Sequence, residues 1–260
     1  AAGVNFWPLA FAREFDDLIL HLRSNENEIT TWVFKTEGNA DFVAAADDAL
    51  INNADNWLIK EIILYIKRTF KRLDVSSRSI ITLVEPGSCY TGTLMELVLA
   101  ADRSYMLDGV FEGSSITAAS LRPTTMNFGH LPMCNDLSRL ETRFLNNETK
   151  IAAIKTKIGI DLDAELAEEL GLVTFIPDDI DWADEVRIAI EERASYSGDA
   201  LTGMEASLRF AGPETLETKI FGRLSAWQNW IFQRPNAVGE EGALKLFGTG
   251  KQAKFDRKRV

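Results

Sequence analysis

Hydrophobic side chains recur every three or four residues along several stretches of the chain, which is the spacing of one face of an α-helix. This spacing predicts helices over 8–23, 56–73, 94–101, 137–145, 162–170, 183–194, 203–210 and 213–232. Runs rich in β-branched and aromatic residues predict strands over 28–35, 79–84, 104–106, 116–120 and 172–176. Because SIITLV at 79–84 shows little polar alternation, we expect that strand to be buried on both faces.

The order of these elements predicts an α/β fold. Strands alternate with helices over residues 1–182, which favours a sheet covered by helices, whereas 183–260 is helical only. We therefore expect a core over 1–182 and a helical C-terminal lobe over 183–260 that serves packing or oligomerisation. The chain enters a helical pattern soon after Ala1, so we expect that it is trimmed or is part of a longer protein.

Composition narrows the class of partner. The chain has 260 residues, 46% of them hydrophobic, which allows a sizeable core, and a formal net charge of −11. This charge disfavours nucleic acid and anionic membranes, because phosphate binding needs a basic patch. Two cysteines imply no disulfide framework, and no apolar run reaches the length of a membrane span or resembles a signal peptide. We expect a soluble, cytoplasmic protein.

A short turn before one helix is the first candidate site. Thr91-Gly92-Thr93 leads into the helix predicted over 94–101, and Glu96 lies one turn inside it. The first N–H groups of a helix have no internal partner and lie at the positive end of its dipole, so the N–H of Thr93 is a candidate oxyanion donor. Glu96 lies on the same face and is suited to acid–base chemistry beside a thioester. A buried turn with a purely structural Glu96 fits the same spacing.

The segment 91–102 resembles a motif of the crotonase (enoyl-CoA hydratase/isomerase) superfamily, because Glu96, Leu97 and Asp102 match its glutamate, leucine and aspartate. Upstream, FVAAAD at 42–47 resembles the first oxyanion loop of that superfamily. The resemblance implies a spiral of repeated ββα units and an oxyanion hole made by the N–H groups of Ala46 and Thr93. It also implies Glu96 as the catalytic acid–base, a coenzyme A thioester as substrate, and neither a separate cofactor nor a metal.

Further stretches extend the resemblance over about residues 5–256, namely 167–173 and 239–244, with the first β-hairpin of the fold missing before Asn5. Four others are similar to the second of two modules in one ring-opening lyase of the superfamily: 74–79, 85–89, 177–185 and 220–232. This similarity implies a role in aerobic benzoate degradation, on an epoxide or dihydrodiol of benzoyl-CoA. It also implies a partner, either a second crotonase-like module or another copy of the chain.

The chain departs from the superfamily pattern at the turn itself. Hydratases carry a second glutamate, whose place in PTTMNFG at 123–129 falls on Thr124 or Thr125, and a hydroxyl has no pKa near neutrality. Ala45 and Thr93 stand where the superfamily has glycine. Three interpretations therefore stay open for this chain: a catalytic part of the lyase, a non-catalytic module that scaffolds a catalytic one, or a generic enoyl-CoA hydratase or isomerase.

Two arginines are candidates for contact with the phosphates of coenzyme A. Arg122 and Arg139 follow the turn in sequence, and a guanidinium group donates strong, charge-assisted hydrogen bonds to phosphate oxygens. Salt bridges at the protein surface would explain the same residues equally well.

Overall fold

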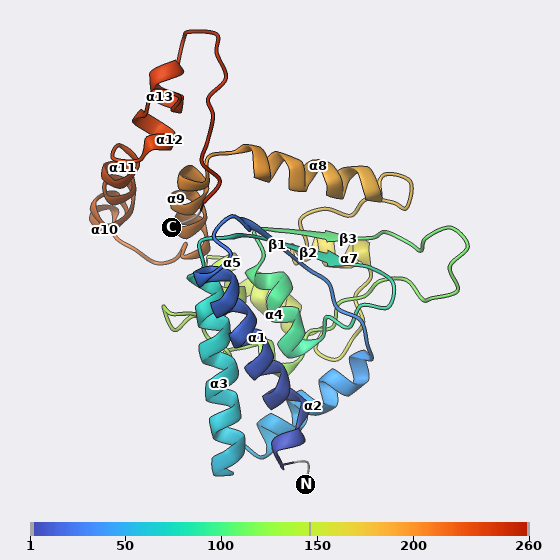
Figure 1. Cartoon of the computed structure of the whole chain (residues 1–260). Coiled ribbons are helices and arrows are strands. Elements are labelled where there is room, and N and C mark those ends of the chain that lie inside the picture. The colour runs from blue at the N-terminus through green and yellow to red at the C-terminus, as the bar shows by residue number, and fades with distance from the viewer. Residues whose placement is uncertain (1–2, 146, 259–260) are drawn as a thin grey trace.

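A three-stranded parallel sheet lies at the centre of the computed structural model, which describes residues 3–145 and 147–258. The strands are β1 (Thr31–Phe34), β2 (Ser79–Val84) and β3 (Arg103–Met106), with β2 in the middle. Every residue of β2 is buried, as its apolar sequence predicts. Figure 1 shows the sheet between two layers of helices.

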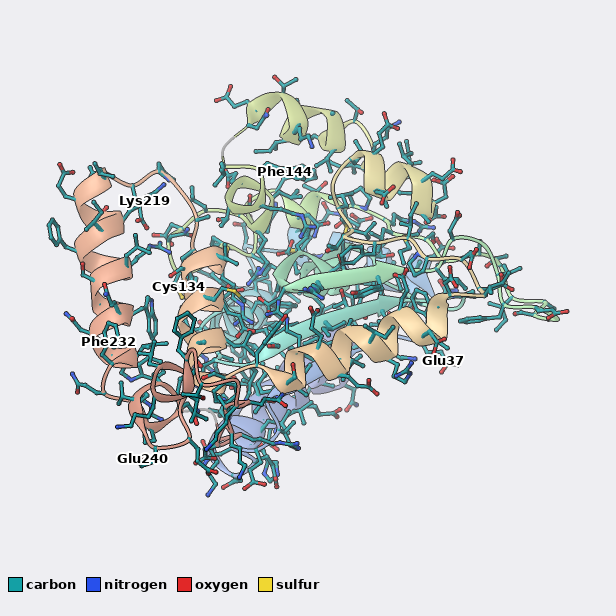
Figure 2. The ribbon with its side chains drawn as sticks, turned by 90° about the horizontal axis from the view of Figure 1, so that it is seen from above. Glu37, Cys134, Phe144, Lys219, Phe232 and Glu240 are labelled. Atoms are coloured by element: carbon teal, nitrogen blue, oxygen red, sulfur yellow. The ribbon has the colours of Figure 1, made fainter. Side chains whose placement is uncertain are left out.

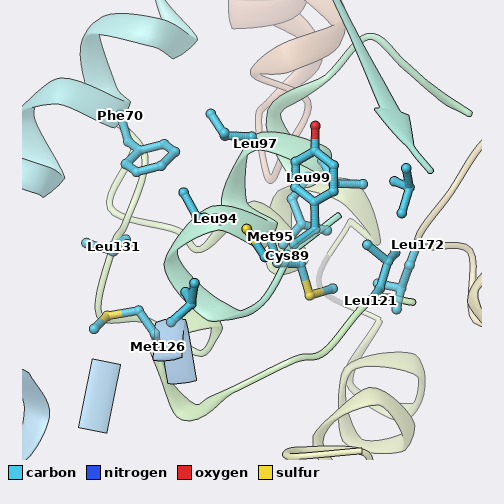
Figure 3. Packing of buried hydrophobic residues seen from close by; sticks show 14 of the residues in the cluster. Phe70, Cys89, Leu94, Met95, Leu97, Leu99, Leu121, Met126, Leu131 and Leu172 are labelled. Atoms are coloured by element: carbon cyan, nitrogen blue, oxygen red, sulfur yellow. The ribbon is translucent and has the colours of Figure 1, made fainter. Parts of the chain in front are cut away.

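Four helices cover one face of the sheet: α1 (Trp7–Ser24), α2 (Ala40–Asn52), α3 (Trp57–Asp74) and α4 (Gly92–Ala100). The first and third pack against each other through aromatic rings, with Phe70 in contact with Phe11 and Phe15. The helix α4 is the most enclosed, since all its residues from Gly92 to Leu99 are buried. Figure 3 shows its leucines surrounded by apolar side chains from other elements.

The helix α8 (Trp182–Ser195) covers the opposite face of the sheet, as Figures 1 and 2 show. Its Trp182 and Ala189 form a small second core with Ile81, Leu83 and Tyr105 of the central strands. The helix α8 packs against the sheet, although most of it follows residue 182, where we expect the core to end. The expected boundary between the core and the C-terminal lobe stays a prediction.

The strands predicted over 116–120 and 172–176 are wrong. The first segment has no strand, and the second contributes one isolated bridge between Phe175 and Tyr105. Just after the first segment, Leu121 forms a bridge with Leu162, and Arg122 forms a bridge with Thr91. Because these two neighbours pair with different segments, they form no strand. The chain between β3 and α8 otherwise forms short helices: η2 (Thr125–Asn127), α5 (Arg139–Arg143), α6 (Glu148–Lys155) and α7 (Ala164–Glu169).

Beyond α8 the described residues form helices and no strand. These are α9 (Gly198–Arg209), α10 (Leu216–Lys219), the π-helical turn η3 (Ile220–Leu224), α11 (Ser225–Ile231), α12 (Pro235–Val238) and α13 (Ala243–Leu246). The run from α10 to α11 confirms the helix predicted over 213–232. Figure 2 shows it, between Lys219 and Phe232, standing away from the sheet. None of the described helices has the length and apolar character needed to cross a membrane.

Candidate functional site

The site lies where the first two strands end. The loop after β1 runs into α2, and the loop after β2 runs into α4, so residues of both helices meet at the carboxyl edge of the sheet. Side chains tie the two loops together. The Tyr90 hydroxyl donates to the Phe34 carbonyl at 2.9 Å, and the Cys89 N–H donates to the Thr36 hydroxyl at 3.1 Å. These contacts fix the start of α4 relative to α2.

The carboxylate of Asp47 occupies the N-terminus of α4. The N–H of Thr93 donates to Asp47 Oδ2 at 2.8 Å, and the hydroxyl of Thr93 donates to Oδ1 at 2.5 Å. The hydroxyl of Thr124 adds a third hydrogen bond to Oδ2 at 3.2 Å. Asp47 has no solvent exposure. The backbone donor that the sequence assigns to an oxyanion therefore binds a side chain of the same protein.

Gly92 allows this close approach. Its φ of +45° lies in the left-handed region that favours glycine. A Cβ atom at this position would stand 1.8 Å from Asp47 Oδ2 and 2.5 Å from Thr124 Oγ1. The space in which a larger residue would place its side chain is thus filled by the buried carboxylate.

Burial raises the pKa of Asp47 to about 6, although the hydrogen bonds from Thr93 and Thr124 favour the charged form. The carboxyl group is consequently ionised in most molecules at neutral pH. A negative charge at this position faces the positive end of the α4 dipole, which is a common arrangement for anions in proteins.

Glu96 is held in a separate buried network. Its Oε2 accepts a hydrogen bond of 2.7 Å from Arg139 Nη1, and its Oε1 accepts one of 2.7 Å from Asn127 Nδ2. Arg139 also binds Asp74 through two hydrogen bonds of 3.1 and 2.7 Å. Burial raises the pKa of both Glu96 and Asp74, and the guanidinium of Arg139 opposes that rise. Since Glu96 is only 1% exposed, its carboxylate has no open face.

Sequence comparison connects the chain with part of a larger enzyme. No family model matches it. Over all 260 residues it is 58% identical to the benzoyl-CoA-dihydrodiol lyase of Aromatoleum evansii, and it spans 46% of the length of that protein. The expected similarity to a lyase of benzoyl-CoA derivatives is therefore confirmed, and the chain matches slightly less than half of that protein.

Solved structures decide the fold. An enoyl-CoA hydratase/isomerase from Cupriavidus metallidurans CH34 is 16% identical and superposes with a TM-score of 0.68, covering 94% of this chain and 84% of its own. An enoyl-CoA hydratase from Bacillus anthracis is 15% identical, with a TM-score of 0.66 and coverage of 96% and 90%. The chain has the crotonase fold. The missing first hairpin and the position as the second of two modules stay predictions.

Within this crotonase fold, the segment expected to form the first oxyanion loop is helical. Ala46 lies in the interior of α2, so its N–H belongs to the hydrogen-bond series of the helix. Use of this N–H as an oxyanion donor would require the helix to open. The catalytic roles of Ala46, Thr93 and Glu96 stay predictions.

The two arginines proposed to contact coenzyme A lie apart, and both are engaged by carboxylates. Arg122 forms a bidentate ion pair with Asp161, with both hydrogen bonds at 2.7 Å, and a further bond of 2.5 Å to Asp41. Arg139 is 2% exposed and lies between Asp74 and Glu96. Coenzyme A could reach Arg139 only if the buried network opened.

Sequence reasoning missed the residues that close this site. In the sequence, Asp47 is only the last residue of the motif at 42–47, and no pattern marks Asn127 or Asp74 as part of a site. One signal for Asp47 was present: it lies four residues after Val43 and three before Leu50, both buried, which places it on the inner face of the helix. Among the described residues, no group of three or more His, Cys, Asp or Glu is arranged to hold a metal ion.

Proposed function

We propose that the chain is a crotonase-fold module of a lyase that acts on an aromatic coenzyme A thioester, and that it scaffolds the catalytic part of that protein. The observation that carries the proposal is the carboxylate of Asp47 bound to the N–H of Thr93. The similarity to 46% of a benzoyl-CoA-dihydrodiol lyase supports the larger protein and its substrate class. Ring opening of an epoxide or dihydrodiol of benzoyl-CoA then belongs to the whole protein.

Electrostatics argues against thioester chemistry at the α4 turn. An oxyanion hole works through donors that point at the place where negative charge develops. Here the Thr93 donor is already satisfied, and a thioester oxygen beside it would meet the Asp47 carboxylate, whose like charge opposes a developing oxyanion. Glu96 adds no compensation, because both of its oxygens are bound by buried donors.

The proposal is tested in the joined protein, which contains this chain and the remainder of the lyase. Ring-opening turnover is measured for Glu96→Gln and Asp47→Asn, with the exposed Glu168→Gln as the matched control. We expect kcat within about twofold of the unchanged protein for all three, because no proton or charge at these positions is used in the reaction. The isolated 260-residue chain should show no turnover.

The contrary result is equally clear. If Glu96→Gln lowers kcat by roughly 100-fold or more while circular dichroism and the melting temperature stay normal, this module carries the acid–base group and the scaffold proposal is wrong. Turnover by the isolated chain would lead to the same conclusion.

A further inference from the structure

A cavity of about 340 Å³ separates the core from the C-terminal helices. Its walls come from the end of α4, from α5 and from α9, which stand close together in Figure 1. The volume lies at the lower end of the range for small-molecule pockets. The cavity lies at the end of α4 opposite to the Thr93 turn, so it is a separate place in the fold.

Arg209 holds the two walls of the cavity in a fixed relation. Its guanidinium binds Asp102 with hydrogen bonds of 3.0 and 2.6 Å, and it donates to the carbonyls of Ser76 and Arg78 at 2.5 Å each. These four bonds attach α9 to the edge of the sheet. The cavity therefore lies between elements that hydrogen bonds tie to each other.

The carboxylates in the cavity wall already have cations. Asp74 pairs with Arg139 at 2.7 Å, and Asp102 pairs with Arg209 at 2.6 Å. Glu205 lies 3.8 Å from Arg193 and 3.9 Å from Arg209. Every acidic group that lines the cavity is thus within ion-pair distance of at least one guanidinium.

Arg143 differs from the other three arginines of the wall. Its Nε donates to the Gly171 carbonyl at 2.8 Å, and among the described residues no carboxylate lies within ion-pair distance of its guanidinium. Burial lowers the pKa of Arg143, and no neighbouring negative charge opposes this change. Arg143 is half-buried, and among the described residues no carboxylate competes with an incoming anion for its terminal nitrogens.

Two more donors of the same wall lack partners within the described part of the chain. Thr142 Oγ1 and Arg193 Nε are buried and make no hydrogen bond, although both residues line the cavity. Each residue is more than nine-tenths buried, with exposures of 5% and 7%. Both atoms are inaccessible to solvent, so a ligand in the cavity does not reach them, and Arg143 remains the cation of this wall that a ligand can meet.

The rest of the wall is apolar. Leu99, Met133, Met204 and Leu208 face the cavity together with alanines of α4. We propose that the cavity binds a monocarboxylate with a compact apolar body, the carboxylate paired with Arg143 and the body against these leucines and methionines. Such a ligand supplies Arg143 with a carboxylate, and removal of its apolar surface from water contributes to binding.

Charge selects against phosphate esters as ligands. A phosphate monoester is dianionic at neutral pH, and it would lie beside Asp74, Asp102 and Glu205 with one unpaired guanidinium to balance it. Repulsion between the phosphate and these three carboxylates, in a site that is partly shielded from water, disfavours the dianion. A monoanion has only the single charge that Arg143 neutralises.

The test uses the intact 260-residue chain and isothermal titration calorimetry at low ionic strength, with hexanoate as the probe. Hexanamide keeps the apolar body without the charge, acetate keeps the charge without the body, and inorganic phosphate supplies a dianion. Arg143→Met removes the cation, Arg143→Lys keeps a positive charge, and Arg187→Met is the control, since Arg187 is paired on an exposed helix surface. Circular dichroism verifies that each variant is folded.

We expect one hexanoate per chain, with affinity reduced roughly 10- to 100-fold by Arg143→Met and unchanged by Arg187→Met, because a charge-assisted hydrogen bond is lost only in the first. Arg143→Lys should retain part of the affinity. Acetate, hexanamide and phosphate should each bind at least roughly tenfold more weakly. The proposal is overturned if hexanoate fails to bind, if Arg143→Met leaves its affinity unchanged, or if hexanamide or phosphate binds equally well. If Arg143→Met does not fold, the affinities of hexanoate and hexanamide for the unchanged chain still test whether binding requires the negative charge of the ligand.

Discussion

Asp47 and Gly92 show how one residue pair closes a turn that could otherwise accept a ligand. Glycine at the start of a helix leaves room for a ligand oxygen to approach the first N–H groups. Here the same room holds a carboxylate from the neighbouring helix, bound by Thr93 and Thr124. The glycine is thus required by the protein's own packing, whatever the module does catalytically.

Replacement of Asp47 by asparagine should change the pH dependence of stability. The native pKa of about 6 lies above the ordinary value of 3.8, so the native state binds more protons than the unfolded state between these values. Stability from this group is therefore present at low pH and lost as the pH rises to about 6. Between pH 4 and 7 the unchanged chain should lose roughly 2–2.5 kcal/mol more than Asp47→Asn.

Urea unfolding at a series of pH values measures this difference, because the contributions of all other groups are shared by the two proteins. Asp108→Asn is the matched control, since Asp108 is exposed in a loop and is not among the charges that shift the pKa of Asp47. Parallel curves for the unchanged chain and Asp47→Asn would contradict the prediction.

Gly92→Ala should destabilise the chain by at least about 2 kcal/mol, because a left-handed φ costs a residue with a Cβ roughly 1–2 kcal/mol and the clash with Asp47 adds to it. Denaturant midpoints measure the loss. Gly113→Ala is the control, since its φ is also positive at +76° and no atom stands within 4 Å of the added carbon. In the double variant Asp47→Ala/Gly92→Ala part of the loss should be recovered, and an additive result would argue against the clash.

At the residue scale, the sequence identified Thr93 and Glu96 correctly as neighbours on one helix face, because their spacing is local. It could not show what binds them. Asp47 precedes Thr93 by 46 positions, and Arg139 follows Glu96 by 43, so both contacts exist only after the fold brings distant elements together. Burial of a charged residue is a property of these tertiary contacts.

At the scale of elements, α4 and α5 are joined by a charge network inside an apolar layer. Arg139 of α5 lies between Glu96 of α4 and Asp74 at the end of α3, and its guanidinium also stacks 5.1 Å from the ring centre of Phe70. Three elements therefore depend on one side chain for their relative position.

Removal of that side chain should be costly. Arg139→Met leaves Glu96 and Asp74 buried without their cation, and loss of one partner of a buried ion pair typically costs about 3–5 kcal/mol. The loss should be smaller at pH 5 than at pH 7, because protonation of the two carboxyl groups, whose pKa values burial raises, relieves the unpaired charge.

Guanidinium chloride unfolding at both pH values measures the effect. The control is again Arg187→Met, which breaks exposed ion pairs of α8 and should cost much less stability than Arg139→Met. Equal losses for the two variants would mean that the buried network contributes no more than a surface pair.

The long helices and the three strands of the sheet were predictable from the sequence, whereas the isolated bridges were not. The helices α1, α3 and α8 have apolar residues at helical spacing over several turns, and this long pattern distinguishes a helix from a strand. The runs at 116–120 and 172–176 have the composition of strands, but composition alone does not tell a ladder from the single bridges at Leu121 and Phe175. Whether a strand extends depends on the register of its partner, which sequence patterns do not give.

At the scale of the whole molecule, the C-terminal helices leave apolar side chains uncovered. Leu216, Phe221 and Leu224 are 71%, 71% and 63% exposed, and Phe247 is 88% exposed. Apolar patches of this kind mark contact surfaces in soluble proteins. They agree with the expected role of the C-terminal lobe in packing against another module or copy.

The isolated chain should therefore self-associate through this surface. Sedimentation velocity or light scattering over a range of concentrations should show association that the double variant Phe221→Ser/Leu224→Ser reduces, with little change in melting temperature because both side chains are already exposed. Val110→Ser, an exposed residue on a distant loop, is the control. A monomer at all concentrations would mean that the uncovered side chains do not drive association.

The π-helical turn η3 also constrains how the length of the chain can change. It inserts one residue into the helical run between α10 and α11, and each residue turns an α-helix by about 100°. Trp227, beyond the turn, packs its indole 3.5 Å from where a Cβ of Gly203 would stand. Loss of a single codon within η3 would convert the wide turn into an ordinary α-helical turn and keep the phase of α11, whereas loss of the codon for Ser225 or Ala226 would swing this indole away from α9. The turn η3 is thus the place in this helical run where loss of one residue is absorbed most easily.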